Sequence, residues 1–184
     1  MRTGPIVHHL VLRILSARAR QGVLEAGWLR LPCAIGRSGI SFRKREGDGA
    51  TPAGRWPLRQ AFMRADRVRS GIRIAPRLRT LSGRALTVAD GWCDAPGDRN
   101  YNRFVTHPYP ASAERLWRDD GLYDVIVVLA HNECPRVRGH GSAIFLHCAS
   151  PDLRPTEGCV AVRRSDLLKL LPRLSSKSRL LVTR

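Results

Sequence analysis

One stretch near the C-terminal end, from Ser142 to Val162, constrains the chain more than any other, because each of its two apolar runs carries a reactive side chain. The run from Ser142 to Leu146 predicts a buried strand that ends at His147. The loop that follows contains two prolines and cannot continue that strand, and a second apolar run begins at Cys159. If the second strand returns beside the first, a thiol and an imidazole emerge at the same edge of one sheet.

These two groups are suited to nucleophilic catalysis. A thiol with a pKa of about 8.5 is mostly protonated at neutral pH, so it needs a nearby imidazole to take its proton. Gly158, immediately before the cysteine, has no Cβ, so a substrate carbonyl can approach the backbone and accept N–H hydrogen bonds there. A cysteine in an apolar strand is, however, usually an inert core residue, and the pair alone leaves that interpretation open.

Two motifs resemble those of one enzyme family. His147, followed after a loop by the block Thr156-Glu157-Gly158-Cys159-Val160, resembles the signature of the YkuD-type L,D-transpeptidases, in which a histidine precedes a Ser/Thr-x-Gly-Cys-Val/Ile block. Far upstream, the segment from Lys44 to Gly54 ends in Thr-Pro-Ala-Gly and resembles the glycine-rich TP-x-G segment of the family. The two matches occur in the family's order, and the resemblance is strongest over residues 30–184.

The resemblance implies roles for individual residues. Cys159 is expected to attack a peptide carbonyl and form a thioester, with His147 as the group that activates it. The backbone carbonyl of Cys148 is expected to orient the imidazole, and N–H groups around Gly158 and Cys159 to form the oxyanion hole. An acceptor amine then resolves the thioester without ATP, and neither a metal nor an organic cofactor is implied.

The resemblance also implies the fold and the partners. It predicts a mainly β protein, a single catalytic domain over residues 1–184, with a YkuD-like mixed β-sandwich or partial barrel and a few short α-helices. The implied partners are the peptide stems and glycan of peptidoglycan, as donor and acceptor. No residue pattern indicates an oligomeric state.

Three positions depart from the common family pattern. Glu157 occupies a place where the family often has histidine or arginine, Ala161 stands where an arginine usually follows, and Cys148 replaces glycine or serine. A carboxylate beside the nucleophile raises the pKa of the thiol unless it points away, and losing the arginine removes a clamp for a substrate carboxylate. With the proline-rich segment from His107 to Pro110, these changes resemble a proteobacterial branch associated with 1→3 crosslinks, from L-Ala at position 1 to diaminopimelate at position 3.

Other functions remain open beside 1→3 crosslinking. The first alternative is 3→3 transpeptidation. A hydrolase of the same fold would use water in place of the amine, and a non-enzymatic module would only bind the wall or another polyanion. In the irregular segment from Gly91 to Arg103 we expect substrate contacts, with a plain surface loop as an equal alternative. Further contacts are expected after the strand at 123–129 and in the loop before the predicted nucleophile. The candidate residues are Tyr101, Asn102, His131, Asn132, Arg154, Thr156 and Glu157.

Length and cysteine usage bound the fold further. A chain of 184 residues forms one domain that buries about 70% of its unfolded surface without covalent staples. The five cysteines are an odd number without a CxxC pair, which argues against a disulfide framework. Zinc-ligand types do cluster in the second half of the chain, but no compact pair anchors them as a metal site would require; the residues are His131, Cys134, His140, His147, Cys148 and Cys159.

The formal net charge of +17 invites a nucleic-acid interpretation. The arginines are scattered from Arg2 to Arg184 without forming a tail or a reading element, so we do not expect nucleic-acid binding. The same positive charge would equally attract the protein to an anionic polymer of the cell wall. The apolar run from Ile6 to Leu12 is too short to span a membrane and has the wrong order for a secretory signal, although the implied substrate lies in the periplasm.

The remaining pattern predicts elements around these motifs. Strands are expected at residues 6–12 and 28–31 in an antiparallel meander, at 123–129 and at 179–183, and a loop at 44–54 is expected to pack beneath the catalytic edge. Between 56 and 86 the chain is rich in arginine, and only a short strand near 85–88 is expected. A helical turn is expected at 111–117, and a helix at 166–171 with Ser165 as its N-cap and Pro172 as its end.

Overall fold

The structure is a computed structural model that describes residues 5–14, 16, 19–68 and 81–183. Within these ranges the chain is mainly β, with one short α-helix, α1 (Arg164–Leu170), and one 3₁₀ turn, η1 (Leu171–Arg173). No helix of the described residues is long and apolar enough to cross a membrane. The strands are β1 (His9–Ile14), β2 (Gln21–Ala26), β3 (Leu29–Ala34), β4 (Ile40–Ser41), β5 (Thr51–Pro52), β6 (Gly54–Met63), β7 (Ser82–Ala85), β8 (Asp90–Cys93), β9 (Arg103–Thr106), β10 (Ala113–Arg115), β11 (Val125–Leu129), β12 (Phe145–Cys148), β13 (Val160–Val162) and β14 (Arg179–Val182).

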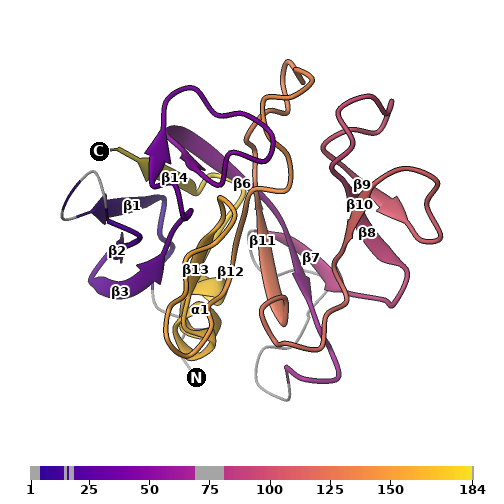
Figure 1. The fold of residues 1–184 in the computed structure, drawn as a ribbon. Helices are drawn as coiled ribbons and strands as arrows, with labels where there is room; N and C mark the ends of the chain where they lie inside the picture. The colour runs from indigo at the N-terminus through magenta and orange to yellow at the C-terminus, as the bar shows by residue number, and fades with distance from the viewer. Residues whose placement is uncertain (1–4, 15, 17–18, 69–80, 184) are drawn as a thin grey trace.

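The main sheet closes on itself like a barrel (Figure 1). Its strand order is β11-β12-β13-β3-β2-β1-β14-β6-β7, and an additional pairing of β11 with β6 completes the ring. The ten residues of β6 make this closure possible, because the segment from Gly54 to Pro57 pairs with β14 while the segment from Leu58 to Met63 pairs with β11. Pro57 lies where the pairing changes, and its carbonyl accepts a hydrogen bond from the N–H of Ala130 at 2.9 Å.

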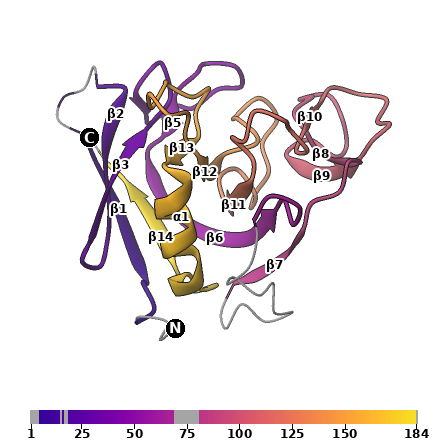
Figure 2. The ribbon, with the colours of Figure 1, turned by 90° about the horizontal axis from the view of Figure 1, so that it is seen from below.

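Alternate residues of β11 and β12 pack in two different hydrophobic cores. Val125, Val127 and Leu129 point into the main core inside the ring, whereas Ile126 and Val128 point to a second core outside it. Because successive strand residues point to opposite faces, a strand covered on both sides is apolar throughout, as β11 is. In Figure 2, α1 crosses the end of β12, and its buried leucines at positions 167 and 170 join the main core.

The second core lies beneath a separate three-stranded sheet of order β10-β8-β9. Figure 1 shows this sheet as a lobe beside the main ring. Trp92 of β8 packs edge-to-face against Phe145 of β12 with 5.3 Å between ring centroids, and Phe104 of β9 stacks on Phe62 of β6 at 5.9 Å. The small sheet is thereby held against the outer face of β6 and β12.

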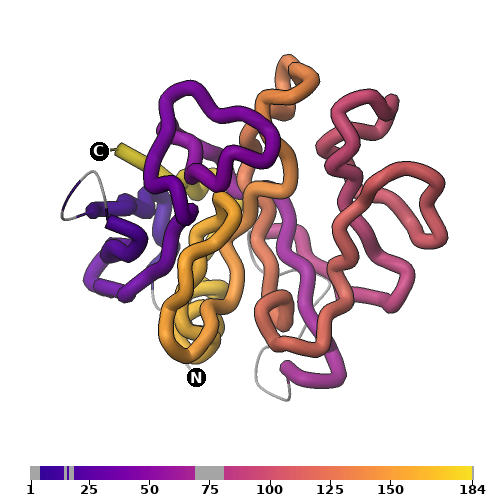
Figure 3. The backbone as a smooth tube through the Cα atoms, viewed as in Figure 1, coloured from indigo at the N-terminus to yellow at the C-terminus, as the bar shows by residue number. Residues whose placement is uncertain are grey.

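Two long loops lie side by side along one end of the ring, as the tube in Figure 3 shows. One spans residues 36–50 and the other residues 130–143, and the N–H of Glu46 donates a hydrogen bond of 2.9 Å to the carbonyl of Gly139. The predicted 44–54 loop therefore packs at the end of the strands that carry the candidate site.

Several predicted elements are confirmed. The mainly β class is correct, and β1, β3, β11, β14 and α1 lie within a few residues of their predicted positions. β2, which was not predicted, joins β1 and β3 into an antiparallel meander. The predicted strands at the two ends of the 142–162 stretch are β12 and β13, which pair in parallel.

Four predictions about secondary structure are wrong. The arginine-rich region contains β6, the longest strand described. β6 forms because strands distant in sequence pair with both of its edges, which no local pattern predicts. β7 begins three residues earlier than the strand predicted near 85–88, and residues 69–80 lie outside the described residues. The predicted helical turn at 111–117 is strand β10, which pairs with β8. α1 has Arg163 rather than Ser165 at its N-cap, without a side-chain cap bond, and Pro172 lies within η1.

Candidate active site

The register of β12 and β13 brings the predicted nucleophile and base to one face. The strands run parallel, with Leu146 opposite Val160 and His147 opposite Ala161. Leu146 and Val160 point into the main core, so His147 points outward, and Cys159, two residues before Ala161, points the same way. Strands about 4.8 Å apart and a two-residue rise of about 6.6 Å separate the Cα atoms of Cys159 and His147 by about 8 Å, which their side chains can bridge.

A cavity of about 580 Å³ lies over this outer face. Cys159, His147 and Ala161 form one wall, and side chains from the three-stranded sheet and the segment after it form the opposite wall. Loop residues complete the lining: Lys44, Glu46, Gly47, Ser142, Ala143, Ile144, Ala149, Ser150, Arg154, Pro155, Thr156 and Glu157. The proline-rich segment from His107 to Pro110 is not part of the lining within the described structure.

The thiol of Cys159 is held by backbone groups. It is 8% exposed, its sulfur donates to the carbonyl of Ala143 at 3.1 Å, and it accepts from the N–H of Phe145 at 3.3 Å. Burial raises the pKa of this thiol to about 12, and the nearby carboxylate of Glu114 contributes in the same direction. The thiol of Cys159 is therefore neutral near pH 7.

The imidazole of His147 is buried and oriented. Its Nδ1 lies 2.9 Å from the carbonyl oxygen of Cys148. A carbonyl can only accept, so Nδ1 carries the hydrogen and Nε2 is left as the basic nitrogen. Burial lowers the pKa of His147 to about 4, which keeps the ring neutral. Tyr123 packs edge-on against the ring with 5.2 Å between centroids and fixes its plane.

Cys148 contributes only its backbone to this arrangement. Its side chain points into the main core, as alternation from His147 requires, and is 1% exposed. Burial raises the pKa of its thiol to about 11. A side chain of any small size therefore serves at this position, which accounts for cysteine in place of glycine or serine.

The loop before the nucleophile is braced by Thr156. Its hydroxyl donates to the carbonyl of Cys159 at 2.6 Å and accepts from the N–H of Gly158 at 3.2 Å. Gly158 has a φ of +139°, and a Cβ there would lie 2.8 Å from the carbonyl oxygen of Ala50. Glycine is required at this position by the packing of the 44–54 loop, and its N–H is engaged by Thr156 in this structure.

Glu157 points away from the nucleophile. Its carboxylate accepts two hydrogen bonds of 2.8 Å from Nε of Arg37, and its side chain is 75% exposed. The carboxylate whose charge reaches Cys159 is instead Glu114 of β10. Arg154 also lines the cavity, with its guanidinium paired to Asp152 at 2.9 Å.

The 44–54 loop places a buried cation near the cavity. The side chain of Lys44 is 5% exposed, pairs with Asp48 and donates to the carbonyl of Arg45 at 3.0 Å. Its charge lowers the pKa of Cys159, against the larger effect of burial. The hydroxyl of Tyr101 donates to Glu46 in the same loop, so Tyr101 anchors the loop and does not line the cavity.

Asn102 joins the small sheet to the loops at the cavity edge. Its Oδ1 accepts from Nε1 of Trp92 at 2.9 Å and from the N–H of Ala143 at 3.2 Å. Its Nδ2 donates to the carbonyls of His131 and Asn132 at 3.0 and 2.9 Å. With 3% exposure and no place in the cavity lining of the described chain, Asn102 braces Ala143, which holds the thiol.

His131 and Asn132 likewise lie within the 130–143 loop and outside the lining described for the cavity. Nε2 of His131 donates to the carbonyl of His140 at 2.8 Å, and burial lowers the pKa of the ring. The side-chain amide of Asn132 donates to the carbonyls of Val137 and Gly141, each at 2.9 Å. These contacts shape the loop.

The sequence-based prediction missed most of the cavity lining, including three charged residues on the side of the small sheet: Asp94, Glu114 and Arg118. Asp94 directly follows β8, Glu114 lies in β10, and Arg118 lies between β10 and β11. The sequence carries no signal for β10, because its three residues are too few for periodicity to separate a strand from a turn of helix.

Among the described residues, no three histidine, cysteine, aspartate or glutamate side chains are grouped so as to hold a metal ion. All five cysteines are free; Cys134 is exposed and the other four are buried.

Comparison with known proteins identifies the family of the chain. Residues 14–182 match the family model YkuD, the L,D-transpeptidase catalytic domain. Neither a curated protein nor a solved structure matches the chain. Enzymes of this family act on peptidoglycan, which lies outside the cytoplasmic membrane. Since the match covers most of the chain, the protein belongs to the YkuD family of L,D-transpeptidase catalytic domains.

Proposed function

We propose that this protein joins peptide stems of peptidoglycan through a thioester on Cys159, with His147 as the general base. One observation carries the proposal: Cys159 and His147 share the outer face of adjacent parallel strands and line the same cavity. The Nδ1 bond to the Cys148 carbonyl leaves Nε2 as the nitrogen that can take the thiol proton.

The first step is acylation. The Cys159 thiol gives its proton to Nε2 of His147 as the sulfur attacks the donor carbonyl, and the tetrahedral intermediate collapses when the C–N bond breaks and the leaving amine takes the proton from His147. Because burial raises the pKa of the thiol and lowers that of the imidazole, a preformed ion pair is disfavoured and proton transfer accompanies the attack.

The second step is transfer to the acceptor. An acceptor amine attacks the thioester carbonyl, the C–S bond breaks, and the thiol of Cys159 is restored. Backbone N–H groups around Gly158 and Cys159 are the proposed oxyanion donors, and the N–H of Gly158 has to exchange its bond with Thr156 to serve in this role.

The favoured linkage is 1→3. A 3→3 donor carries a terminal carboxylate one residue beyond the scissile carbonyl, and the position where the family pattern has an arginine is Ala161, directly opposite His147. The cations that line the cavity are each paired with an aspartate of this chain, at Lys44–Asp48, Arg118–Asp120 and Arg154–Asp152. The described cavity thus offers no unpaired cation to the carboxylate of the leaving residue in either donor, so the preference for 1→3 rests on the resemblance of the sequence to that branch of the family.

The proposed substrates place the protein in the periplasm, where both donor and acceptor stems are found. The proposed contacts with these stems come from the cavity lining around Thr156, Glu157 and Arg154. The net charge of +17 favours association with an anionic wall.

Purified disaccharide-peptide muropeptides, incubated with the wild type and with Cys159→Ala, test the proposal by mass spectrometry with fragmentation to locate each new bond. We expect dimers joined through position 1 that are absent with the variant. Dimers joined through position 3 would instead establish 3→3 transpeptidation. Shortened monomers without dimers would establish a hydrolase. Identical products from both proteins would indicate a protein that binds the wall without catalysing a reaction.

A further inference from the structure

We propose that Glu114 binds the ammonium group of the acceptor stem in the cavity and thereby directs the thioester to an amine rather than to water. The inference rests on the proposed transpeptidation and adds to it a residue that selects the second substrate.

The position of Glu114 follows from the pairing of the small sheet. Glu114 lies opposite Trp92 in the antiparallel pair of β10 and β8, so both side chains project from the same face. Trp92 packs on Phe145 of β12, the strand that carries His147. Glu114 therefore projects from the cavity wall that faces the catalytic wall, and its charge is close enough to raise the pKa of Cys159.

The carboxylate of Glu114 is positioned through one of its oxygens. Oε1 accepts from the hydroxyl of Tyr123 at 2.6 Å and lies 3.6 Å from Nη1 of Arg118. Among the described residues neither contact involves Oε2, which is left for a ligand. The side chain is 28% exposed, and Arg118 is held more closely by Asp120, at 2.5 Å. Burial raises the pKa of Glu114, whereas the Tyr123 hydroxyl and the Arg118 charge favour its ionised form.

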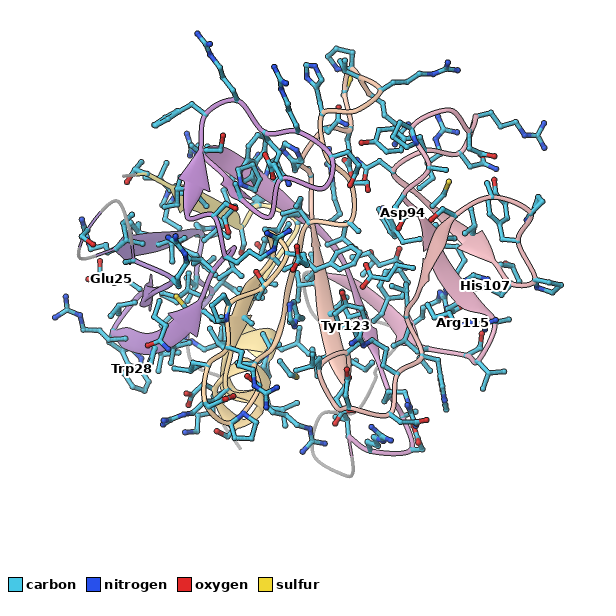
Figure 4. All side chains as sticks on the ribbon, in the orientation of Figure 1. Glu25, Trp28, Asp94, His107, Arg115 and Tyr123 are labelled. Carbon is cyan, nitrogen blue, oxygen red and sulfur yellow. The ribbon has the colours of Figure 1, made fainter. Side chains whose placement is uncertain are left out.

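A second carboxylate lies on the same wall. Asp94 follows Trp92 by two residues and so shares its face, diagonal to Glu114. Its Oδ1 is buried and has no hydrogen-bond partner among the described residues. Figure 4 labels Asp94 on the small sheet and Tyr123 beside β11. A buried acceptor without a donor is costly, and an ammonium group supplies three donors.

The charges of the cavity therefore favour a cationic ligand. Each cation of the lining is neutralised by an aspartate; these cations are Lys44, Arg118 and Arg154. Glu114 and Asp94 face the cavity, and each has an oxygen for which the described residues provide no hydrogen-bond donor. An acceptor amine arrives as an ammonium ion at neutral pH, and water has no charge to be recognised. Carboxylates opposite the thioester concentrate the amine there and leave water unaffected.

The chemistry balances with the groups present. The bound ammonium loses one proton to solvent, and the resulting amine attacks the thioester carbonyl while Nε2 of His147 takes a second proton from its nitrogen. The new C–N bond forms, the C–S bond breaks, and His147 gives that proton to the sulfur of Cys159.

The test compares wild type with Glu114→Gln, which keeps the shape and an acceptor for the Tyr123 hydroxyl while removing the charge. Intact-protein mass spectrometry follows acylation by the donor, and chromatography of the products gives the ratio of crosslinked dimer to hydrolysed monomer. We expect acylation within about twofold of wild type and a dimer-to-hydrolysis ratio lowered about tenfold or more, with a higher KM for the acceptor, because a hydrogen bond to a charged group is lost.

Glu25→Gln is the matched control, since Glu25 lies on β2 in ion pairs with Arg13 and Arg30 at a similar side-chain exposure of 21%. It should keep the wild-type ratio. Tyr123→Phe removes the donor that positions Glu114 and keeps the aromatic ring beside His147, so it should lower the ratio by a smaller factor.

Two results overturn the inference. One is normal acylation of Glu114→Gln with an unchanged ratio, which leaves transpeptidation intact and removes only the role of Glu114. The other is an acceptor KM of the wild type that stays constant as salt is raised, because a charge-based contact must weaken with screening; this measurement decides the matter if Glu114→Gln does not fold. Failure of the wild type to acylate removes the proposed function, and this inference with it.

Discussion

Replacing Gly158 by alanine tests the packing that holds the nucleophile in place. Gly158 has a φ of +139°, which an L-residue adopts at a cost of about 1–3 kcal/mol. The new Cβ would lie 2.8 Å from the backbone oxygen of Ala50, and moving that backbone adds about 1–3 kcal/mol. The midpoint of the summed cost is about 4 kcal/mol, and for a protein of this size it lowers Tm by about 8–16 °C.

The strain also shifts the neighbouring Cys159, and a displacement of about 1 Å in a catalytic group lowers turnover about a hundredfold. Thermal unfolding followed by circular dichroism measures the first effect, and dimer formation measures the second. Gly97→Ala is the matched control, because a Cβ at Gly97 meets no atom within 4 Å. If Gly158→Ala unfolds within about 2 °C of that control, the contact with Ala50 does not constrain position 158 and the reasoning is wrong.

Three further predictions follow from burial and hydrogen bonding. Burial lowers the pKa of His147 to about 4 from about 6.5 in the unfolded chain, so the unfolded state binds the extra proton in that window and stability falls by about 3 kcal/mol as the pH drops from 6.5 to 4. Urea unfolding should show this loss in the difference between wild type and His147→Gln, and a difference independent of pH would contradict it. Because burial raises the pKa of the Cys159 thiol to about 12, iodoacetamide at neutral pH should modify the exposed Cys134 first, and peptide mass spectrometry giving the reverse order would count against a protonated resting thiol. Asn102→Ala should lower the free energy of unfolding by about 2–4 kcal/mol in chemical denaturation, since four hydrogen bonds are lost, whereas lost activity with unchanged stability would restore it as a substrate contact.

The parts of the fold that could be predicted from sequence are those in which local pattern and burial agree. β11 is a run of β-branched and leucine residues because it is covered on both faces, and no surface constraint interrupts the pattern. The two strands next to His147 and Cys159 could also be predicted, because apolar runs mark the strands and two prolines mark the loop between them. The role expected of the Cys148 carbonyl came from the family resemblance, and the parallel direction of the strand pairing was not predicted.

The parts that escaped prediction depend on partners distant in sequence. β6 contains arginine, glutamine, a glycine and a proline, and it becomes a strand because β11 and β14, both far from it in sequence, pair with it. β10 has three residues, too few for periodicity to separate a strand from a turn of helix. Glu114 was missed with it, since nothing near Glu114 in sequence reveals that the small sheet faces Cys159.

Tyr101 and Asn102 are the opposite case, because the sequence suggested substrate contacts and the structure shows hydrogen bonds within the protein. Their polar groups within an irregular segment suggested binding, and the structure places both inside, where their hydrogen bonds go to Glu46 and to backbone groups of other loops. Polar residues of a loop that bridges two sheets are needed to satisfy buried backbone groups, and composition alone cannot separate that role from recognition.

The central claim is that Cys159 becomes acylated during the reaction. Intact-protein mass spectrometry of the wild type after rapid acid quenching with a donor stem measures this directly, and peptide mapping locates the adduct. We expect an adduct equal to the donor acyl group on Cys159, lost when an acceptor amine is added and absent from Cys159→Ala. Crosslinked dimers made by Cys159→Ala, or an acyl adduct on another residue that is consumed by the acceptor, would contradict the account.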